Sequence, residues 1–297
     1  MLVKSVLLIT LAALSFGCAA THPPVNAIAP TGMALVPAGE FMMGNDATDP
    51  LERMGGIQAI NEMPKRKVYV KAFYMDRYEV TNLEYKVFIE NLKKGGVRAL
   101  AQYINDGIPV PDHWSKETGT FKYGQERHPV IDVDWYMANL YCLMRGKRLP
   151  TEEEWEKAAR GIDERIYPWG NEYGRDLAAT REVCDDKGLH FNACRPFEVG
   201  SFKKDVSIYG ISDMAGNAME WTATRYAPYP GAPVANSVRF TPEENVMTLR
   251  GGAHDTLLFE FGRTTARHFR RATDMMEAHA DWHTDMNVGF RCVMDAE

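Results

Sequence analysis

Alternation of hydrophobic and polar residues predicts short strands near both ends of the chain. Residues 34–43 alternate around a Pro-Ala-Gly turn, which indicates a hairpin-like pair of strands. Residues 68–75 alternate again, and this pattern is typical of a strand with one buried face. Runs at 246–250 and 288–294 predict further strands near the C-terminus.

Capping signals predict three helices between these strands. A capping box at residues 81–84 (Thr-Asn-Leu-Glu) starts the first, because the threonine can accept a backbone hydrogen bond while the glutamate reaches back. The second is expected over residues 134–145, since Gly146 is a good left-handed terminator. The third starts at another capping box in residues 151–154 and ends at Gly161.

After Gly161 the chain is rich in glycine, proline and aromatic residues and shows little periodicity. Such a stretch would normally argue against a compact domain, unless bound metal and disulfides organise the loops. The sequence has no internal repeat and no low-complexity block. We therefore expect one α+β domain with few helices, short strands and long ordered loops.

The first residues are typical of a targeting segment. A lysine precedes a short apolar run, which is too short to span a bilayer and has the size of a signal-peptide core. Small residues and Cys18 follow. We interpret residues 1–18 as a signal peptide, 19–32 as a flexible tether and 33–297 as the folded domain.

Residues 14–18 are similar to a bacterial lipobox, in which the cysteine becomes the lipidated first residue of the mature protein. Lipidation of Cys18 would anchor the protein to a membrane of the bacterial envelope. Ordinary cleavage near Ala19-Ala20 is the alternative and would give a soluble periplasmic protein. Both interpretations predict export.

Composition and charge are those of an ordinary globular protein, with 45% hydrophobic and 25% charged residues. The net charge is −6 and no basic stripe is present, so nucleic acid is not an expected partner. The cysteines are more informative about the fold. The four besides Cys18 are an even number in an exported chain and predict two disulfides, although the sequence leaves three pairings open.

Two carboxylates and a sharp turn suggest a cation site. Asp213 and Glu220 lie seven residues apart on either side of Gly216-Asn217, where the backbone can turn and direct carbonyl oxygens inward. Hard cations such as Ca²⁺ bind several carboxylate and carbonyl oxygens. The alternative is that Asp213 caps the turn while Glu220 pairs with an arginine.

Histidines gather in the last fifth of the chain. His279 and His283 are four residues apart, so that one helical turn could present both to a metal. Asp281 and Asp285 add carboxylates nearby. The alternative is a solvated polar loop.

Several motifs follow one another in order along the expected domain. They occupy residues 37–44, 73–82, 128–135, 147–161, 167–171, 209–221, 250–252 and 289–292. Together they cover about residues 33–294 and resemble the formylglycine-generating-enzyme family, also called the sulfatase-modifying-factor family. The resemblance implies a C-type-lectin-like core elaborated by long loops.

The resemblance also implies a structural calcium ion. In the family the segment around Gly216 holds Ca²⁺, which implies the side chains of Asp213 and Glu220 and the carbonyls of Gly216 and Ala218 as ligands. A second family calcium site is harder to place, because Thr180 or Arg181 stands where a ligating asparagine is expected.

Two disulfides are implied as well. Cys142 and Cys292 occupy positions that are disulfide-linked in well-known family members, which leaves Cys184 to pair with Cys194. This pairing leaves no reactive thiol in the mature chain.

The thiols that carry the family's chemistry are missing. The oxidases bind Cu(I) through two cysteines that follow a Gly-Gly pair, here at 251–252, and by position Thr256 and Phe261 stand in their place. Neither can act as the soft thiolate that suits Cu(I), so no copper is expected. His254, Thr256 and Arg267 remain as groove candidates, residues that could line the family's substrate groove. Ion pairing to local acids is the alternative for Arg267.

We therefore expect an exported envelope protein whose domain acts as a binding or scaffold module for a peptide or protein. Because these thiols are missing, we do not expect conversion of cysteine to formylglycine to be its activity. The alternative is a periplasmic enzyme with different oxidative or tailoring chemistry in the same groove. The sequence names neither the ligand nor the partner.

Overall fold

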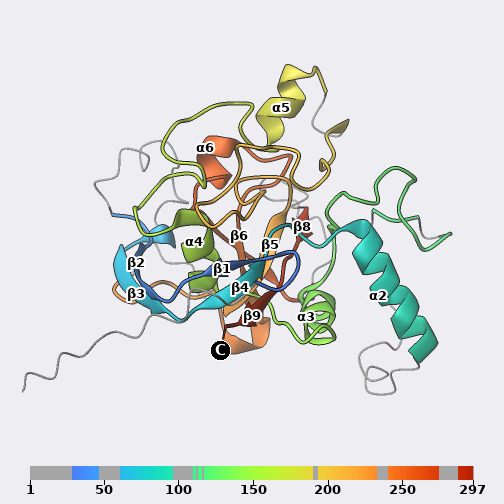
Figure 1. Ribbon diagram of the computed structural model, residues 1–297, viewed down its shortest axis with the longest axis horizontal. Coiled ribbons are helices and arrows are strands. Elements are labelled where there is room, and N and C mark those ends of the chain that lie inside the picture. The colour runs from blue at the N-terminus through green and yellow to red at the C-terminus, as the bar shows by residue number, and fades with distance from the viewer. Residues whose placement is uncertain are drawn as a thin grey trace, which may run out of the picture.

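The structure of the chain, a computed structural model, describes residues 29–46, 61–95, 110–111, 113–115, 117–189, 193–232, 240–273 and 287–296. Figure 1 shows that these residues form short strands and a few helices connected by long loops. The predicted α+β architecture is confirmed. No helix in these ranges is both long and apolar enough to cross a bilayer.

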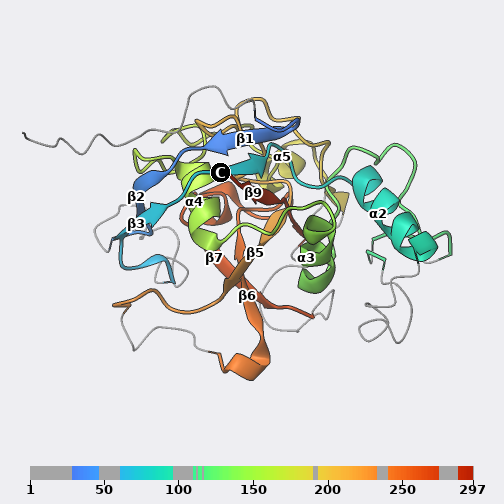
Figure 2. The same ribbon diagram turned by 60° about the horizontal axis from the view of Figure 1, so that its bottom comes forward.

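The first and last described strands meet in one sheet. β1 (Met33–Val36) and β9 (Val293–Asp295) flank the central β4 (Phe73–Asp76), and both run antiparallel to it. Figure 1 and Figure 2 show the three strands side by side. The two ends of the domain are therefore held together by backbone hydrogen bonds to the same strand.

The predicted hairpin at residues 34–43 is wrong. β2 (Gly39–Met43) pairs with β3 (Arg66–Val70) in a two-stranded sheet, whereas β1 pairs with β4. The turn between β1 and β2 contains a proline, which has no N–H to donate, and both strands take partners from the segment 66–76 instead. That segment, predicted as one strand at 68–75, is itself interrupted between β3 and β4.

The third sheet has four strands and lies at the centre of the molecule. β6 (Val246–Arg250) is buried along its whole length and pairs antiparallel with β7 (Arg267–Arg271) on one side and β5 (Met219–Arg225) on the other. β8 (Val288–Gly289) runs parallel to β5. The strand predicted at 246–250 is confirmed, and the one predicted at 288–294 is divided between β8 and β9.

Two helices contribute to the core beside this sheet, and the first begins at the predicted capping box. α2 (Asn82–Gly95) follows Thr81, whose amide donates to the Glu84 carboxylate at 2.9 Å. α3 (Trp135–Leu143) is capped by Asp134, which accepts from the amide of the third residue of the helix at 2.7 Å. Their apolar faces join the largest hydrophobic cluster together with residues of β5 and β6.

α4 (Glu152–Arg160) is the most deeply buried helix of the described chain. The Thr151 hydroxyl accepts from the Glu154 amide at 3.2 Å, and the Glu154 carboxylate accepts from the Thr151 amide at 2.8 Å. The predicted capping box is therefore confirmed, as is the end of the helix at Gly161, where φ is 72°. Every residue of α4 except Glu153 is buried, so its charged side chains need partners inside the protein.

Two disulfides lie among the described residues. Cys142 of α3 is linked to Cys292, and Cys184 of α5 (Arg181–Asp186) is linked to Cys194. The Cα atoms are 5.7 Å apart in both, which is an ordinary disulfide separation. These are the pairs that the resemblance implies.

Removal of the long disulfide should cost more stability than removal of the short one. Cys142 and Cys292 are 150 residues apart and Cys184 and Cys194 are 10 apart. By loop-closure entropy the first bridge contributes about 5 kcal/mol and the second about 3 kcal/mol. Urea unfolding of the paired Cys→Ser variants measures both values. A larger loss from the short bridge would contradict the loop-closure explanation.

Candidate functional site

Four buried carboxylates surround the predicted calcium segment. Asp213 and Glu220 were predicted, whereas Glu79 and Asp205 were not, and all four are almost completely buried. The Asp213 amide donates to the Asp205 carbonyl at 3.0 Å, and its carboxylate accepts from the Gly200 amide at 2.5 Å. The fold thus brings acids from separate loops to one place.

These acids repel one another. Burial raises the pKa of Glu79 well above its usual range, and the charge on Asp213 raises it further against the effect of Arg291. Burial and Asp213 likewise raise the pKa of Asp205 well above its usual range, and burial raises the pKa of Asp213 to about 6. Both oxygens of Glu79 and one of Asp205 have no hydrogen-bond donor among the described residues.

Glu220 is held by an arginine. Arg291 donates from Nε to Oε2 at 2.8 Å and from Nη2 to Oε1 at 2.7 Å. Trp155 of α4 adds a hydrogen bond from its indole nitrogen to Oε2 at 3.0 Å. The contacts of Glu220 are therefore those of the alternative interpretation, in which it pairs with an arginine.

The backbone between these acids turns sharply. Asp213 and Asn217 have φ values of 61° and 72°. A Cβ at Gly216 would lie 2.3 Å from the Ala179 carbonyl oxygen, so only glycine fits there. The Gly216 carbonyl accepts from the Ala218 amide at 3.0 Å.

The predicted calcium ligands are thus only partly together. No three His, Cys, Asp or Glu side chains of the described residues are arranged to hold a metal ion. Glu220 faces Arg291, while Asp213 stands near Glu79 and Asp205, whose buried oxygens lack partners. Unpaired buried carboxylates are costly, and they are the ligands that a hard cation takes. Carboxylate oxygens without hydrogen-bond partners therefore lie on the Asp213 side of the cluster.

The segment around Thr180, where the family's second calcium site was expected, offers a different set of side chains. The Thr180 hydroxyl is buried and has no partner among the described residues. Asp185 and Asp186 are exposed and face nearby arginines at 3.7 and 2.8 Å. The Cys184–Cys194 disulfide closes this loop covalently.

Thr256 and Phe261, which the family resemblance placed at the positions of the copper thiols, are buried and packed. Thr256 Oγ1 accepts from the Ala253 amide at 2.8 Å and donates to the Ala253 carbonyl at 2.9 Å. Phe261 ends α6 (Leu258–Phe261), and its ring stacks on His268 with the centroids 4.7 Å apart. Local contacts therefore occupy both side chains.

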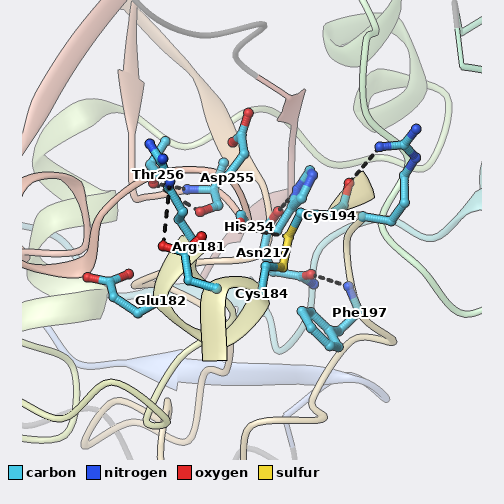
Figure 3. The surroundings of a disulfide bond; sticks show 12 residues. Arg181, Glu182, Cys184, Cys194, Phe197, Asn217, His254, Asp255 and Thr256 are labelled. Atoms are coloured by element: carbon cyan, nitrogen blue, oxygen red, sulfur yellow. Dashed lines mark hydrogen bonds and ion pairs between the residues drawn. A yellow bond between two sulfur atoms is a disulfide. The ribbon is translucent and has the colours of Figure 1, made fainter. Parts of the chain in front are cut away.

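His254 lies beside Thr256 and the Cys184–Cys194 disulfide, as Figure 3 shows. Its Nδ1 is 3.2 Å from the Asn217 carbonyl, and Cys194 Sγ is 3.2 Å from the carbonyl oxygen of His254 itself. Burial lowers the pKa of His254 to about 4, so the imidazole is neutral near pH 7.

Arg267 belongs to another cluster. Its guanidinium is paired with Glu152 of α4, donates to the Asn61 carbonyl at 2.7 Å and lies 3.9 Å from the centre of the Tyr229 ring. It contacts neither of the other two groove candidates and is 2% exposed. The structure therefore does not bring the three groove candidates together, and ion pairing accounts for Arg267.

Further buried ion pairs accompany Arg267. Arg250 of β6 lies 2.6 Å from Glu156 of α4, and Arg263 lies 2.6 Å from Glu62. These guanidinium groups surround His268, and burial, followed by their charges, lowers the pKa of His268 to about 3. Arginines of the central sheet thus neutralise the acids that α4 buries.

Other predicted features lie outside the described residues. These are Cys18, the signal peptide at 1–18, most of the tether at 19–32, and the histidine pair His279 and His283. Lipidation and a histidine metal site therefore stay predictions.

The family can be assigned once this fold and site are compared with known proteins. Residues 19–296 match the family model described as a sulfatase-modifying factor enzyme 1-like domain. The chain belongs to this family.

The relatives are proteins named for different activities. The chain is 30% identical to the mouse protein called inactive C-alpha-formylglycine-generating enzyme 2, over 89% of this chain and 86% of that protein. It is 29% identical to bovine formylglycine-generating enzyme, over 90% and 75%. It is 31% identical to hercynine oxygenase of Mycolicibacterium smegmatis, over 66% and 46%.

Solved structures show the same fold. PvdO from Pseudomonas aeruginosa superimposes with a TM-score of 0.63 at 24% identity, over 89% of this chain and 94% of that one. The structure of CarF superimposes with a TM-score of 0.56 at 18% identity, over 91% and 100%.

Substitution of Arg267 should destabilise the protein. Arg267→Ala removes the closest partner of the buried Glu152 carboxylate, which keeps only the longer contact with Arg250 at 3.3 Å, and loss of one member of a buried ion pair costs about 3–5 kcal/mol. Arg127→Ala is the matched control, because Arg127 pairs with Glu198 on the surface and should change stability by less than about 1 kcal/mol. Urea unfolding measures both. An Arg267→Ala variant as stable as the control would show that Arg267 is free for a ligand.

Proposed function

We propose that the domain is a binding or scaffold module for a peptide or protein of the bacterial envelope, and that it does not convert cysteine to formylglycine. The observation that carries this proposal is the pair Thr256 and Phe261. Both stand at the positions of the copper thiols, both are buried, and local contacts occupy both side chains. A hydroxyl and a phenyl ring cannot replace soft thiolates as ligands of Cu(I).

The relatives support a role of this kind. The mouse and bovine proteins that match nearly the whole chain are named as inactive forms of the formylglycine-generating enzyme. The family therefore includes proteins that are named as inactive, and binding is a function that such a fold can keep.

Location in the envelope rests on the N-terminal segment and on the disulfides. Residues 1–18 have the pattern of a signal peptide, and lipidation of Cys18 would anchor the domain. Both disulfides are buried, and disulfides persist mainly in oxidising compartments.

Enzymatic chemistry of another kind is the second candidate. One relative is named an oxygenase, and two buried histidines, His254 and His268, are neutral near pH 7. Neutral imidazole is the form that binds transition metals. The Nε2 atom of His268 has no partner among the described residues, although three neighbouring arginines oppose a cation there.

A peptide assay separates these candidates. We expect no formylglycine when the purified chain is incubated with a cysteine-containing peptide, Cu(I) and O₂, while a family oxidase run in parallel converts the peptide. Mass spectrometry of the peptide is the readout. Turnover by this chain would overturn the proposal. Stoichiometric iron, copper or zinc in the purified protein would favour the second candidate.

We also propose a structural Ca²⁺ ion on the Asp213 side of the acid cluster. It would bind carboxylate oxygens of Asp213, with Glu79 or Asp205 supplying others, and would neutralise the repulsion among them. Glu220, the other predicted side-chain ligand, is paired with Arg291 and would contribute charge balance.

Calcium should stabilise the wild-type protein and not the Asp213→Asn variant. At a Ca²⁺ concentration of about 100 times Kd the gain is about 2.7 kcal/mol, and excess EGTA should remove it. Thermal unfolding with Ca²⁺ and with EGTA measures the difference. Glu243→Gln, an exposed acid, is the control and should keep the response. Identical wild-type melting curves in Ca²⁺ and EGTA would rule out the ion.

A further inference from the structure

Two exposed apolar side chains lie on the outer face of α2. Leu83 is 49% exposed and Val87 is 45% exposed, and their spacing of four residues directs both side chains to the same side of the helix. The buried residues of α2 face the opposite way, into the largest hydrophobic cluster. Figure 1 and Figure 2 both show α2 at one margin of the molecule. The outer face of its first turns is therefore apolar and open to solvent.

A tight turn beside the start of α2 presents an aromatic ring. Tyr123 is 98% exposed, and Gly124 follows it with a φ of 86°. The Gln125 amide donates to the carbonyl three residues earlier at 3.2 Å, which closes a type II turn with glycine at the position that requires positive φ. The turn is held to the helix, because the Leu83 amide donates to the Glu126 carbonyl at 3.1 Å.

Leu83, Val87 and Tyr123 together form a surface that we call the α2 face. Phe121 connects the turn to the core, since its ring centroid lies 5.4 Å from that of Trp114. The ring of Tyr123 is thus exposed on a turn whose backbone is fixed at both ends. Exposed apolar side chains that gather at one place mark a contact with a partner or a membrane.

The charges around the α2 face do not favour a partner of either sign. Lysines and glutamates of α2 and of the turn occur in similar number: Lys86, Lys93, Lys94 and Lys122 against Glu84, Glu90 and Glu126. Two of the three carboxylates also accept hydrogen bonds from nearby backbone amides. Burial of apolar area would therefore hold this face to its partner, and a net charge on the partner is not required.

The chain enters the domain beside α2. The Arg77 amide donates to the Gly32 carbonyl at 2.9 Å, and Leu83 follows Arg77 by only six residues, so it lies within about 25 Å of Gly32. Residues 19–32 separate the domain from Cys18, the proposed lipid anchor, and can span at most about 50 Å. A lipid on Cys18 would therefore keep the α2 face within reach of the membrane surface.

We infer that the α2 face lies in the headgroup region of the bilayer in which Cys18 is anchored, with its three apolar side chains directed toward the lipid. This inference rests on the proposed lipid anchor and adds the surface by which the domain contacts the membrane. Tyrosine suits this position, because its ring is apolar while its hydroxyl stays among water and headgroups. The opposite margin of the molecule, at β2 and β3, then faces away from the bilayer.

A tryptophan at position 123 tests the inference. The full chain, purified from membranes, is reconstituted in phosphatidylcholine vesicles whose acyl chains carry bromine, which quenches tryptophan fluorescence on contact. Tyr123→Trp should be quenched more than the wild-type chain, whose six tryptophans give the background. Tyr69→Trp is the matched control, because Tyr69 is 63% exposed on β3 at the opposite margin of the molecule. It should add no quenching.

Loss of an apolar side chain should release the face. In the Tyr123→Trp chain, Leu83→Ser and Val87→Ser should each lower the ratio of docked to undocked molecules about three- to tenfold, because about half of each side chain remains to be buried. Ile162→Ser should leave the quenching unchanged, since Ile162 is 66% exposed but follows α4, which packs on β2 and β3.

Mass spectrometry of the same preparation shows whether Cys18 carries a lipid. A chain without lipid would overturn the anchor and this inference together. A lipidated chain in which Tyr123→Trp is quenched no more than Tyr69→Trp would overturn the inference alone. Self-association in detergent that Leu83→Ser abolishes would show that a second copy covers the α2 face, and would also overturn the membrane assignment. Formylglycine formation in the separate peptide assay is the result that would overturn the proposed function itself.

Discussion

The buried ion pair between Arg291 and Glu220 connects segments that are far apart in the sequence. Glu220 belongs to β5, and Arg291 lies two residues before β9. The same guanidinium donates to the Ser212 carbonyl at 3.0 Å, and Trp155 of α4 donates to the same carboxylate. This contact joins the central sheet, the sheet at the chain ends and the most buried helix. It also leaves Asp213, Glu79 and Asp205 as neighbouring buried acids, and burial raises the pKa of Glu79 and of Asp205 well above the usual range.

Local signals in the sequence predicted local structure well. The two capping boxes are formed by neighbouring residues, and the helices at 82–95 and 152–160 begin where they indicate. The hairpin at 34–43 failed because strand pairing depends on distant partners, here the segment 66–76. α6 has no side-chain cap, so nothing in its sequence marked it.

The site was harder to predict, because burial and partners decide it. Arg267 was a ligand candidate by position, yet Glu152 of α4 neutralises it in the interior. Glu79 and Asp205 carry no recognisable spacing to Asp213. Glu79 lies inside a motif that contains several hydrophobic and aromatic residues, and this position could have revealed it. Burial of an ionised side chain is costly, so a glutamate in such a motif indicates a buried partner or ligand. Family resemblance supplied the disulfide pairs, which spacing alone left open.

The contacts made by the last strands have a consequence for how the domain acquires its shape. Residues 288–295 contain β8, Arg291, Cys292 and β9. Each of these contacts a partner that lies much earlier in the sequence. While the chain is still being synthesised, these residues are not yet available. The three-stranded sheet, the four-stranded sheet, the long disulfide and the Arg291 ion pair therefore cannot be completed until they are. Contacts between distant residues also slow folding. The order of synthesis therefore keeps the three-stranded and four-stranded sheets incomplete until the last residues of the domain are delivered.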